Sequence, residues 1–435
     1  MAPDTKLKLR DDIPWSEPAW YTGMESPYYN ESHRKLRDAV RKFVDENILP
    51  YSLDWEAKGE APREVGLKLM QAGIVNDQIP PEYHPPGIPR IAGISVDDMD
   101  PFHQLVLLDE MSRIEGGVVV SLVGANGVGL PPVIEFGTEE QKRKWLPGIL
   151  TKETMFCLGI TEPTTGSDVA NIKTTAEKTP DGKFYVVNGV KKWITGSQWA
   201  THMTTAVRTG DPGFGGISML VIELNSPGVT IEKIHNSGHN AGGASFVELD
   251  NVKVPVENLL ADENEGASII MNNFNKERFL MSVQCNRKAR TCLALSFQYA
   301  LDRHTFGKPL MSNQVIRRKF AELAQRVEAH WAWIEQIAYH VSKSPDGWRS
   351  PDVGSKMALL KVQGTQLLEL ASRESQQVFG GAGYAKSGAG ATIEQISRDV
   401  RVMVSRSRDE LLLKVEEVAN MYSVGCRRWQ RRDYE

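Results

Sequence analysis

The sequence predicts an α+β protein in which two helical domains enclose a central β domain. Helical spacing of apolar residues dominates both ends of the chain, and short β-prone runs separated by turns fill the middle. A chain of 435 residues is long enough for two to four compact units. We expect an N-terminal extension (1–30), a helical domain (31–150), a β domain (151–262) and a helical domain (263–435).

The composition is that of a folded soluble protein. Hydrophobic residues make up 41% and charged residues 24%, which excludes disorder and collagen. The 51 Lys and Arg nearly balance the 55 Asp and Glu, so no overall field draws the chain to nucleic acid. Four scattered cysteines predict neither a disulfide framework nor a metal site. The sequence shows no membrane span, signal, transit peptide or S-K-L ending, which favours a cytoplasmic location.

The N-terminal helices are predicted from apolar residues three and four positions apart. Such stripes are Leu36, Val40, Phe43 and Val44, and further along Leu105, Leu108, Met111 and Ile114. The segment from Glu82 to Pro101 is rich in Pro, Gly and Asp without periodicity, and predicts a surface loop.

The β domain is predicted from runs of β-branched and aromatic residues. They are Phe184 to Val187, Ser218 to Ile222 and Phe246 to Leu249, with Asp-Gly and Pro-Gly turns between them. We also expect a turn at Gly189, directly before Lys192-Trp193-Ile194-Thr195-Gly196.

The C-terminal domain is predicted to consist of long antiparallel helices. Its clearest stripe is Ile316, Phe320, Leu323, Val327, Ile334, Ala338 and Val341. A β unit between two helical halves lets the halves pack together, with a cleft where strands meet helices.

Two short segments could hold a flat heterocycle. The loop from Gly159 to Asp168 places backbone N–H groups and the Thr161 and Ser167 hydroxyls together, although an ordinary turn explains it equally well. Trp193 beside Thr195 offers a ring and a hydroxyl, whereas the alternative is a core tryptophan on a strand.

These segments, with three others, resemble the FAD-dependent acyl-CoA dehydrogenases over most of the chain. The matching motifs are T-E-P-x-x-G-S-D from Thr161, W-I-T from Trp193, Val252-Lys253-Val254-Pro255 with Asn258-Leu259-Leu260, Arg303 to Lys308, and Gly380 to Tyr384. The resemblance implies a helical N-terminal domain, a central β-barrel-like domain and a C-terminal four-helix bundle. It also implies a homodimer or homotetramer with FAD at a subunit interface, an acyl-CoA substrate, and an electron-transferring flavoprotein or dioxygen as acceptor.

The resemblance also implies roles for individual residues. Thr161, Trp193, Ile194 and Thr195 would contact the flavin ring, and Ser167 would contact the cofactor and the mouth of the acyl-CoA pocket. The adenosine diphosphate part of a neighbouring subunit's FAD would be bound by Arg303, Phe306, Gln314, Gln377, Gly380, Gly381 and Gly383. Glycine suits the last three positions because it lets backbone N–H groups approach phosphates.

The catalytic base departs from the commonest family pattern. Many members carry a Glu nine residues after the Arg of an Arg-Asp pair, but counting from Arg398 gives Ser407. A subset, including isovaleryl-CoA-type and long-chain enzymes, carries it on the first helix of the bundle, where this chain has Glu277. On a helix Glu277 shares a face with Phe274, Leu280 and Met281, and apolar surroundings strengthen a carboxylate as a base.

Other assignments of the active site stay open. A register slip would make Glu410 or Asp409 the base, and Glu277 could instead be an exposed, ion-paired residue. Arg278 is expected beside the base, as a catalytic and substrate-binding residue or as a structural ion-pair partner, and Ser407 is expected near the substrate.

Two other functions compete with α,β-dehydrogenation of an acyl-CoA. A flavin oxidase or a divergent enzyme on a non-CoA substrate would explain the missing C-terminal Glu. A DNA-binding flavoprotein would use the basic, aromatic tail from Cys426 to Arg432, but the tail is short and acidic residues follow it. Nucleic acid is therefore the least favoured partner.

Overall fold

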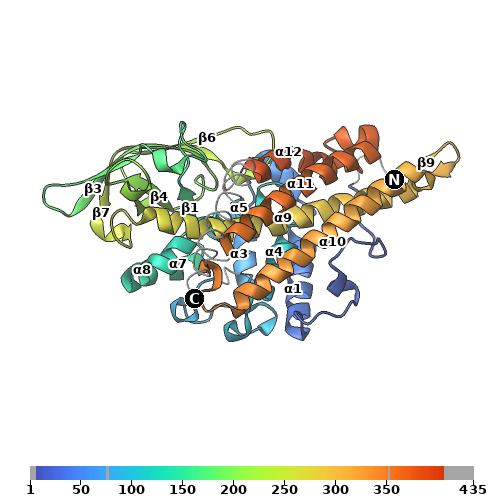
Figure 1. Ribbon diagram of the computed structural model, residues 1–435, viewed down its shortest axis with the longest axis horizontal. Coiled ribbons are helices and arrows are strands. Elements are labelled where there is room, and N and C mark those ends of the chain that lie inside the picture. The colour runs from blue at the N-terminus through green and yellow to red at the C-terminus, as the bar shows by residue number, and fades with distance from the viewer. Residues whose placement is uncertain (1–5, 75–77, 351–352, 406–435) are drawn as a thin grey trace, which may run out of the picture.

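The structure is a computed structural model that describes residues 6–74, 78–350 and 353–405. Figure 1 shows an elongated molecule with the β sheet at one end and long C-terminal helices extending to the other. The N-terminal helices lie against both parts. This arrangement confirms the predicted fold class.

The N-terminal part consists of short helices whose apolar faces meet in one core. Leu36, Val40 and Val44 are fully buried, as the helical spacing predicts. The predicted surface loop contains short 3-10 helices, the last two being Ile91–Gly93 and Val96–Asp98. The α-helices are α1 (Glu31–Asn47), α2 (Ser52–Lys58), α3 (Arg63–Gln71), α4 (Pro101–Met111), α5 (Val118–Val123), α6 (Asn126–Gly129), α7 (Pro131–Phe136) and α8 (Glu139–Leu150).

The central part is one sheet of eight strands. The order along the sheet is β6-β7-β3-β2-β4-β5-β8, and β1 pairs with β4. Side chains of β1 to β5 and β7 enclose a common apolar core, which makes the sheet barrel-like although β6 and β8 end it. The strands are β1 (Phe156–Gly159), β2 (Thr175–Lys178), β3 (Phe184–Ile194), β4 (His202–Arg208), β5 (Ile217–Glu223), β6 (Val229–Lys233), β7 (Ser245–Pro255) and β8 (Leu259–Leu260).

The three predicted β runs lie within β3, β5 and β7, but the predicted turn at Gly189 is wrong. Strand β3 continues to Ile194, and its pairing with β7 shifts register at Gly189. Gly189 has φ 154°, and a Cβ there would lie 2.5 Å from the Thr174 hydroxyl oxygen. The glycine therefore allows close packing inside a bulged strand and does not end the strand.

The C-terminal part is a four-helix bundle of α9 (Gly266–Asp302), α10 (Gln314–Lys343), α11 (Val353–Phe379) and α12 (Ala391–Ser405). Tyr299 near the end of α9 stacks on Phe379 at the end of α11, with ring centroids 4.3 Å apart. These two helices therefore run in the same direction, and α10 and α12 run in the opposite one (Figure 1).

The α10 stripe from Phe320 to Val341 is buried as predicted. A two-stranded hairpin, β9 (His304–Thr305) and β10 (Lys308–Pro309), joins α9 to α10. In the described part of the chain, none of the helices carries an apolar stretch long enough to cross a membrane.

Candidate active site between the sheet and the first bundle helix

The Thr161 loop and the end of β3 are joined by direct contacts. The backbone N–H of Lys192 donates to the carbonyl oxygen of Thr161 at 2.8 Å. The hydroxyls of Thr161 and Thr195 are half-buried and make no hydrogen bond with the described residues. Two segments that the sequence separates by about 30 residues thus form one surface with two available hydroxyl groups.

A buried ion pair that the sequence analysis missed supports this surface. Lys191 Nζ lies 2.8 Å from Glu162 Oε1, and both side chains are buried. Burial lowers the pKa of Lys191 to about 8, although the charge of Glu162 opposes this shift. Burial also acts to raise the pKa of Glu162, but Lys191 and a hydrogen bond from Thr174 outweigh it and lower that pKa. Both groups are therefore charged at neutral pH.

Trp193 stands out from the strand in a strained conformation. Its φ is 65°, a region that bulky residues rarely adopt, and the pairing of β3 with β7 shifts register here. The side chain is 50% exposed, so the alternative of a core tryptophan is wrong. Ile194 is buried in the β core, and only its backbone could reach a ligand. Bulges often redirect a side chain at a functional site. The register shift here turns the Trp193 ring out of the sheet toward solvent.

A cavity of about 200 Å³ lies where the N-terminal helices meet α9. Its wall is mainly apolar and includes Leu108, Met111, Val120 and Ala125, and α9 contributes Leu280. Gly196 follows Thr195 and packs on this wall, since a Cβ there would lie 2.9 Å from the Ala125 Cβ. The Trp193–Thr195 surface and the cavity are therefore neighbours, as the predicted cleft requires.

Glu277 is buried on α9, one helical turn before Leu280. Its exposed fraction is 5%, and its helix neighbours Phe274 and Met281 are buried as well. The alternative of an exposed glutamate is therefore excluded. Arg278 is buried beside it, with Nη1 3.4 Å from Asn275 Oδ1 and the guanidinium 5.9 Å from the Phe274 ring centroid. Glu277 and Arg278 therefore lie on α9 within one helical turn of Leu280, which lines the cavity.

The residues predicted to bind the adenosine diphosphate part of FAD gather at the far end of the bundle. Arg303 follows α9, Gln314 begins α10, and Gln377 and Gly380 lie at the end of α11. Phe306 and Gly307 form the hairpin tip with φ of 52° and 77°, and the Phe306 ring is fully exposed. Gly381 is also exposed and Gly383 is buried. This end therefore presents an arginine, an aromatic ring and accessible backbone to solvent.

The two groups of predicted cofactor contacts do not meet within one chain. Figure 1 places the end of β3 and the β9 hairpin in opposite halves of the molecule. From Leu280 to the end of α9 the helix advances roughly 30 Å. Other predicted residues, Ser407, Asp409, Glu410 and the tail from Cys426 to Arg432, lie outside the described residues.

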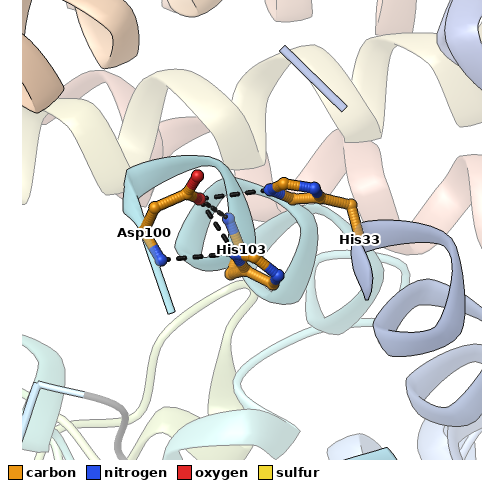
Figure 2. A group of neighbouring side chains, drawn as sticks. All are labelled: His33, Asp100 and His103. Carbon is orange, nitrogen blue, oxygen red and sulfur yellow. Dashed lines mark hydrogen bonds and ion pairs between the residues drawn. The ribbon is translucent and has the colours of Figure 1, made fainter. Parts of the chain in front are cut away.

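A second cluster of polar side chains lies away from this site. Figure 2 shows the Asp100 carboxylate beside two histidines, with Oδ1 3.1 Å from His33 Nε2 and 2.9 Å from His103 Nδ1. The Nδ1 atoms of His33 and His103 also accept the backbone N–H of Asn30 and Asp100, the N-cap residues of α1 and α4. His103 Nε2 lies 2.9 Å from the Ser32 hydroxyl. The cluster therefore joins two capping boxes and fastens α1 to α4.

Comparisons with known proteins cover all three parts of the chain. Residues 30–153 match the acyl-CoA dehydrogenase N-terminal domain, 157–252 the middle domain and 264–404 the C-terminal domain. The acyl-CoA dehydrogenase apdG of Emericella nidulans is 42% identical over 395 residues, which are 89% of this chain and 90% of the relative.

Solved structures share the fold. A putative acyl-CoA dehydrogenase from Mycobacterium smegmatis has a TM-score of 0.82 and 28% identity, over 92% of this chain and 99% of that one. An acyl-CoA dehydrogenase complexed with FAD from Bacillus anthracis has a TM-score of 0.82 and 24% identity, over 93% and 69%. With three matching domains and a relative 42% identical, this chain belongs to the acyl-CoA dehydrogenase family.

Proposed function

We propose that the protein is an FAD-dependent dehydrogenase that converts an acyl-CoA thioester to the trans-2-enoyl thioester, with Glu277 as the base. The observation that carries the proposal is the position of Glu277, a buried carboxylate one helical turn from an apolar cavity. Burying a carboxylate among apolar groups costs desolvation free energy, and proteins usually retain such a group where it has a function.

The residues around Trp193 fit a flavin ring. The exposed indole offers a face for stacking, and the Thr161 and Thr195 hydroxyls are available as donors. The Thr165 hydroxyl in the same loop is buried and has no hydrogen-bond partner among the described residues. At the other end of the molecule, Arg303 and the backbone at Gly380 and Gly381 fit a diphosphate.

The chemistry follows from the weak acidity of the α-carbon of a thioester. FAD, when bound, supplies the acceptor for the hydride that leaves the β-carbon. Glu277 takes the α-proton and becomes a carboxylic acid, while the electron pair of the broken α-C–H bond forms the new double bond. The apolar cavity holds the acyl chain and excludes water. Arg278, the next residue on the helix, positions the Glu277 carboxylate beside the reacting carbons.

The proposal includes assembly of at least two subunits. Its support is the separation of the two groups of cofactor-binding residues, because one FAD cannot contact both groups of the same chain. A homodimer or homotetramer would bring the hairpin end of one bundle to the Trp193 surface of another. The reduced cofactor would then pass electrons to an electron-transferring flavoprotein or to dioxygen.

The test is anaerobic reduction of the flavin by acyl-CoA thioesters, in the wild type and in Glu277→Gln. The variant should retain yellow flavin but bleach at least about 100-fold more slowly, because the base is lost. Glu265→Gln removes an exposed carboxylate just before the same helix and should bleach at the normal rate. Near-normal bleaching in Glu277→Gln would show that another residue is the base.

A further inference from the structure

Two polar side chains of α9 lie on the wall of the mainly apolar cavity. Gln284 and Lys288 are one helical turn apart, and both lie on the cavity wall with Leu280. They continue the helix face that carries Glu277, at seven and eleven residues beyond it. An unsubstituted acyl chain has no polar atom that could form a hydrogen bond with either side chain.

The carboxamide oxygen of Gln284 is buried without a hydrogen bond from the part of the chain that the structure describes. This atom, Oε1, is shielded from solvent as well. A buried amide without a partner is costly, and native structures rarely contain one unless a ligand or water completes it.

The Lys288 ammonium is only partly satisfied. The side chain is 7% exposed, and Nζ donates one hydrogen bond, to the carbonyl oxygen of Ile114. It makes no ion pair with the residues that the structure describes. An ammonium group has three N–H donors, so further donors are available toward the cavity.

Two other polar side chains of the wall, Ser112 and Asn126, already have hydrogen-bond partners within the protein. The Ser112 hydroxyl donates to the carbonyl oxygen of Leu108. Asn126 donates to the carbonyl of Val123 at 2.8 Å and accepts the backbone N–H of Phe156 at 2.7 Å. Gln284 Oε1 differs from these groups because it has no hydrogen-bond partner among the described residues, and Lys288 differs because one hydrogen bond leaves further N–H donors available.

We propose that Gln284 and Lys288 bind a neutral oxygen function, a hydroxyl or a carbonyl, on the acyl chain of the substrate. The inference rests on the proposed function and narrows its substrate class to oxygenated acyl thioesters. A hydroxyl or carbonyl oxygen accepts from Lys288 and from the Gln284 amide N–H, and a hydroxyl also donates to Gln284 Oε1.

The charges around Lys288 favour a neutral group over a carboxylate. Burial lowers the pKa of Lys288, whereas the nearby carboxylates of Glu115 and Asp399 oppose this shift. Glu115 forms an ion pair with Lys6, and Asp399 accepts the backbone N–H of His239 at 2.8 Å. Because these two carboxylates already lie close to Lys288, a substrate carboxylate would add a third negative charge near this one ammonium group.

The oxygen should be remote from the reacting carbons. Seven and eleven residues correspond to about 10 and 16 Å along a helix axis. An extended chain advances about 1.2 Å per bond. Positions near the eighth carbon and beyond are therefore within reach of the two side chains.

The test compares flavin reduction by decanoyl-CoA, 8-hydroxydecanoyl-CoA, 10-hydroxydecanoyl-CoA and decanedioyl-CoA. In the wild type, kcat/KM for one of the hydroxylated thioesters should exceed that for decanoyl-CoA by about tenfold or more, because the plain chain leaves Gln284 and Lys288 unpaired. Gln284→Leu and Lys288→Met should each reduce this ratio by about tenfold. Gln325→Leu makes the same substitution at an exposed position of α10 that does not line the cavity, and it should leave the ratio unchanged.

The outcomes separate the inference from the function on which it rests. If every thioester reduces the flavin and the ratios stay near one, the inference fails and the dehydrogenase function stands. Preference for decanedioyl-CoA would overturn the neutral assignment. If no thioester reduces the flavin, both fail. Flavin content and circular dichroism verify that each variant is folded. If Lys288→Met does not fold, the kcat/KM ratios of the wild type and of Gln284→Leu are sufficient to test the inference.

Discussion

Lys191 and Glu162 form a buried ion pair, with Nζ 2.8 Å from Oε1, that joins the strand of Trp193 to the loop of Thr161. Glu162 also accepts the backbone N–H groups of Lys173 and Thr174 at 2.7 and 3.0 Å. One carboxylate therefore fixes both segments that face the candidate flavin site.

Breaking this pair from one side should destabilise the protein strongly. Lys191→Met leaves the Glu162 charge buried without its partner, which we expect to cost about 3–5 kcal/mol. The double variant Lys191→Met with Glu162→Gln should lose less, because no charge is left unpaired. Urea unfolding followed by circular dichroism measures both. Equal losses in the two variants would mean that the pair acts only through packing.

Removing the exposed ring should alter the flavin without unfolding the chain. Trp193→Ala and Thr195→Ala should each shift the visible flavin spectrum, because the ring loses a stacking surface or a hydrogen bond. Trp15→Ala removes another exposed tryptophan and should leave the spectrum unchanged. Unchanged spectra in both site variants would place the flavin elsewhere.

Sharing of FAD between subunits can be tested by complementation. Trp193→Ala and Arg303→Ala should each lower FAD content and activity in the homo-oligomer. If one FAD contacts Trp193 of one subunit and Arg303 of another, a mixed dimer contains one fully native site and one doubly altered site. Co-expressed variants should therefore regain activity that neither has alone. Lack of recovery in purified mixed dimers would mean that each chain binds its own FAD.

The Asp100 cluster should make stability depend on acid pH. Burial acts to raise the pKa of Asp100, but hydrogen bonding with the His103 and His33 side chains and from the His103 backbone N–H outweighs it and holds this pKa well below its usual range. A carboxyl with a depressed pKa stabilises the fold above the unfolded-state pKa and loses this contribution as the pH falls.

Comparison of Asp100→Asn with the wild type isolates this contribution. Below about pH 4 the wild type should lose stability more steeply than the variant, which cannot titrate at this position. Asp100→Ala removes the cap as well and should cost about 1 kcal/mol even at neutral pH. Thermal unfolding at several pH values provides the measurement, and parallel curves for wild type and Asp100→Asn would refute the role of the charge.

The fold class could be predicted because periodicity reports burial directly. The α10 stripe and the β runs follow the periods of their elements, so which side chains are buried could be inferred locally. The Gly189 turn was wrong because a glycine marks a turn and a bulge equally well, and only the partner strand decides between them. The positions of Gln284 and Lys288 on the cavity wall could not be predicted. A helix in a crowded core buries most of its faces, so its polar residues follow no periodic pattern that would mark the face they lie on.

The buried pair could have been found from strand alternation. Lys191 occupies an inward position of β3, on the side of Tyr185 and Val187, and a lysine there requires a partner. Its partner could not be inferred, because Glu162 lies on a loop whose path depends on the sheet.

The unbroken course of α9 restricts how this chain can change length. Glu277, Gln284 and Arg303 lie on or directly after one helix without an intervening loop, so a single inserted or deleted residue between them would rotate one relative to the others by about 100°. Loops elsewhere can absorb such events, as the Pro-rich segment before α4 can. If the proposed roles of these residues hold, descendants of this gene can acquire new acyl specificity by substitution along α9, whereas gain or loss of a codon within it would separate the proposed base from the proposed nucleotide-binding end.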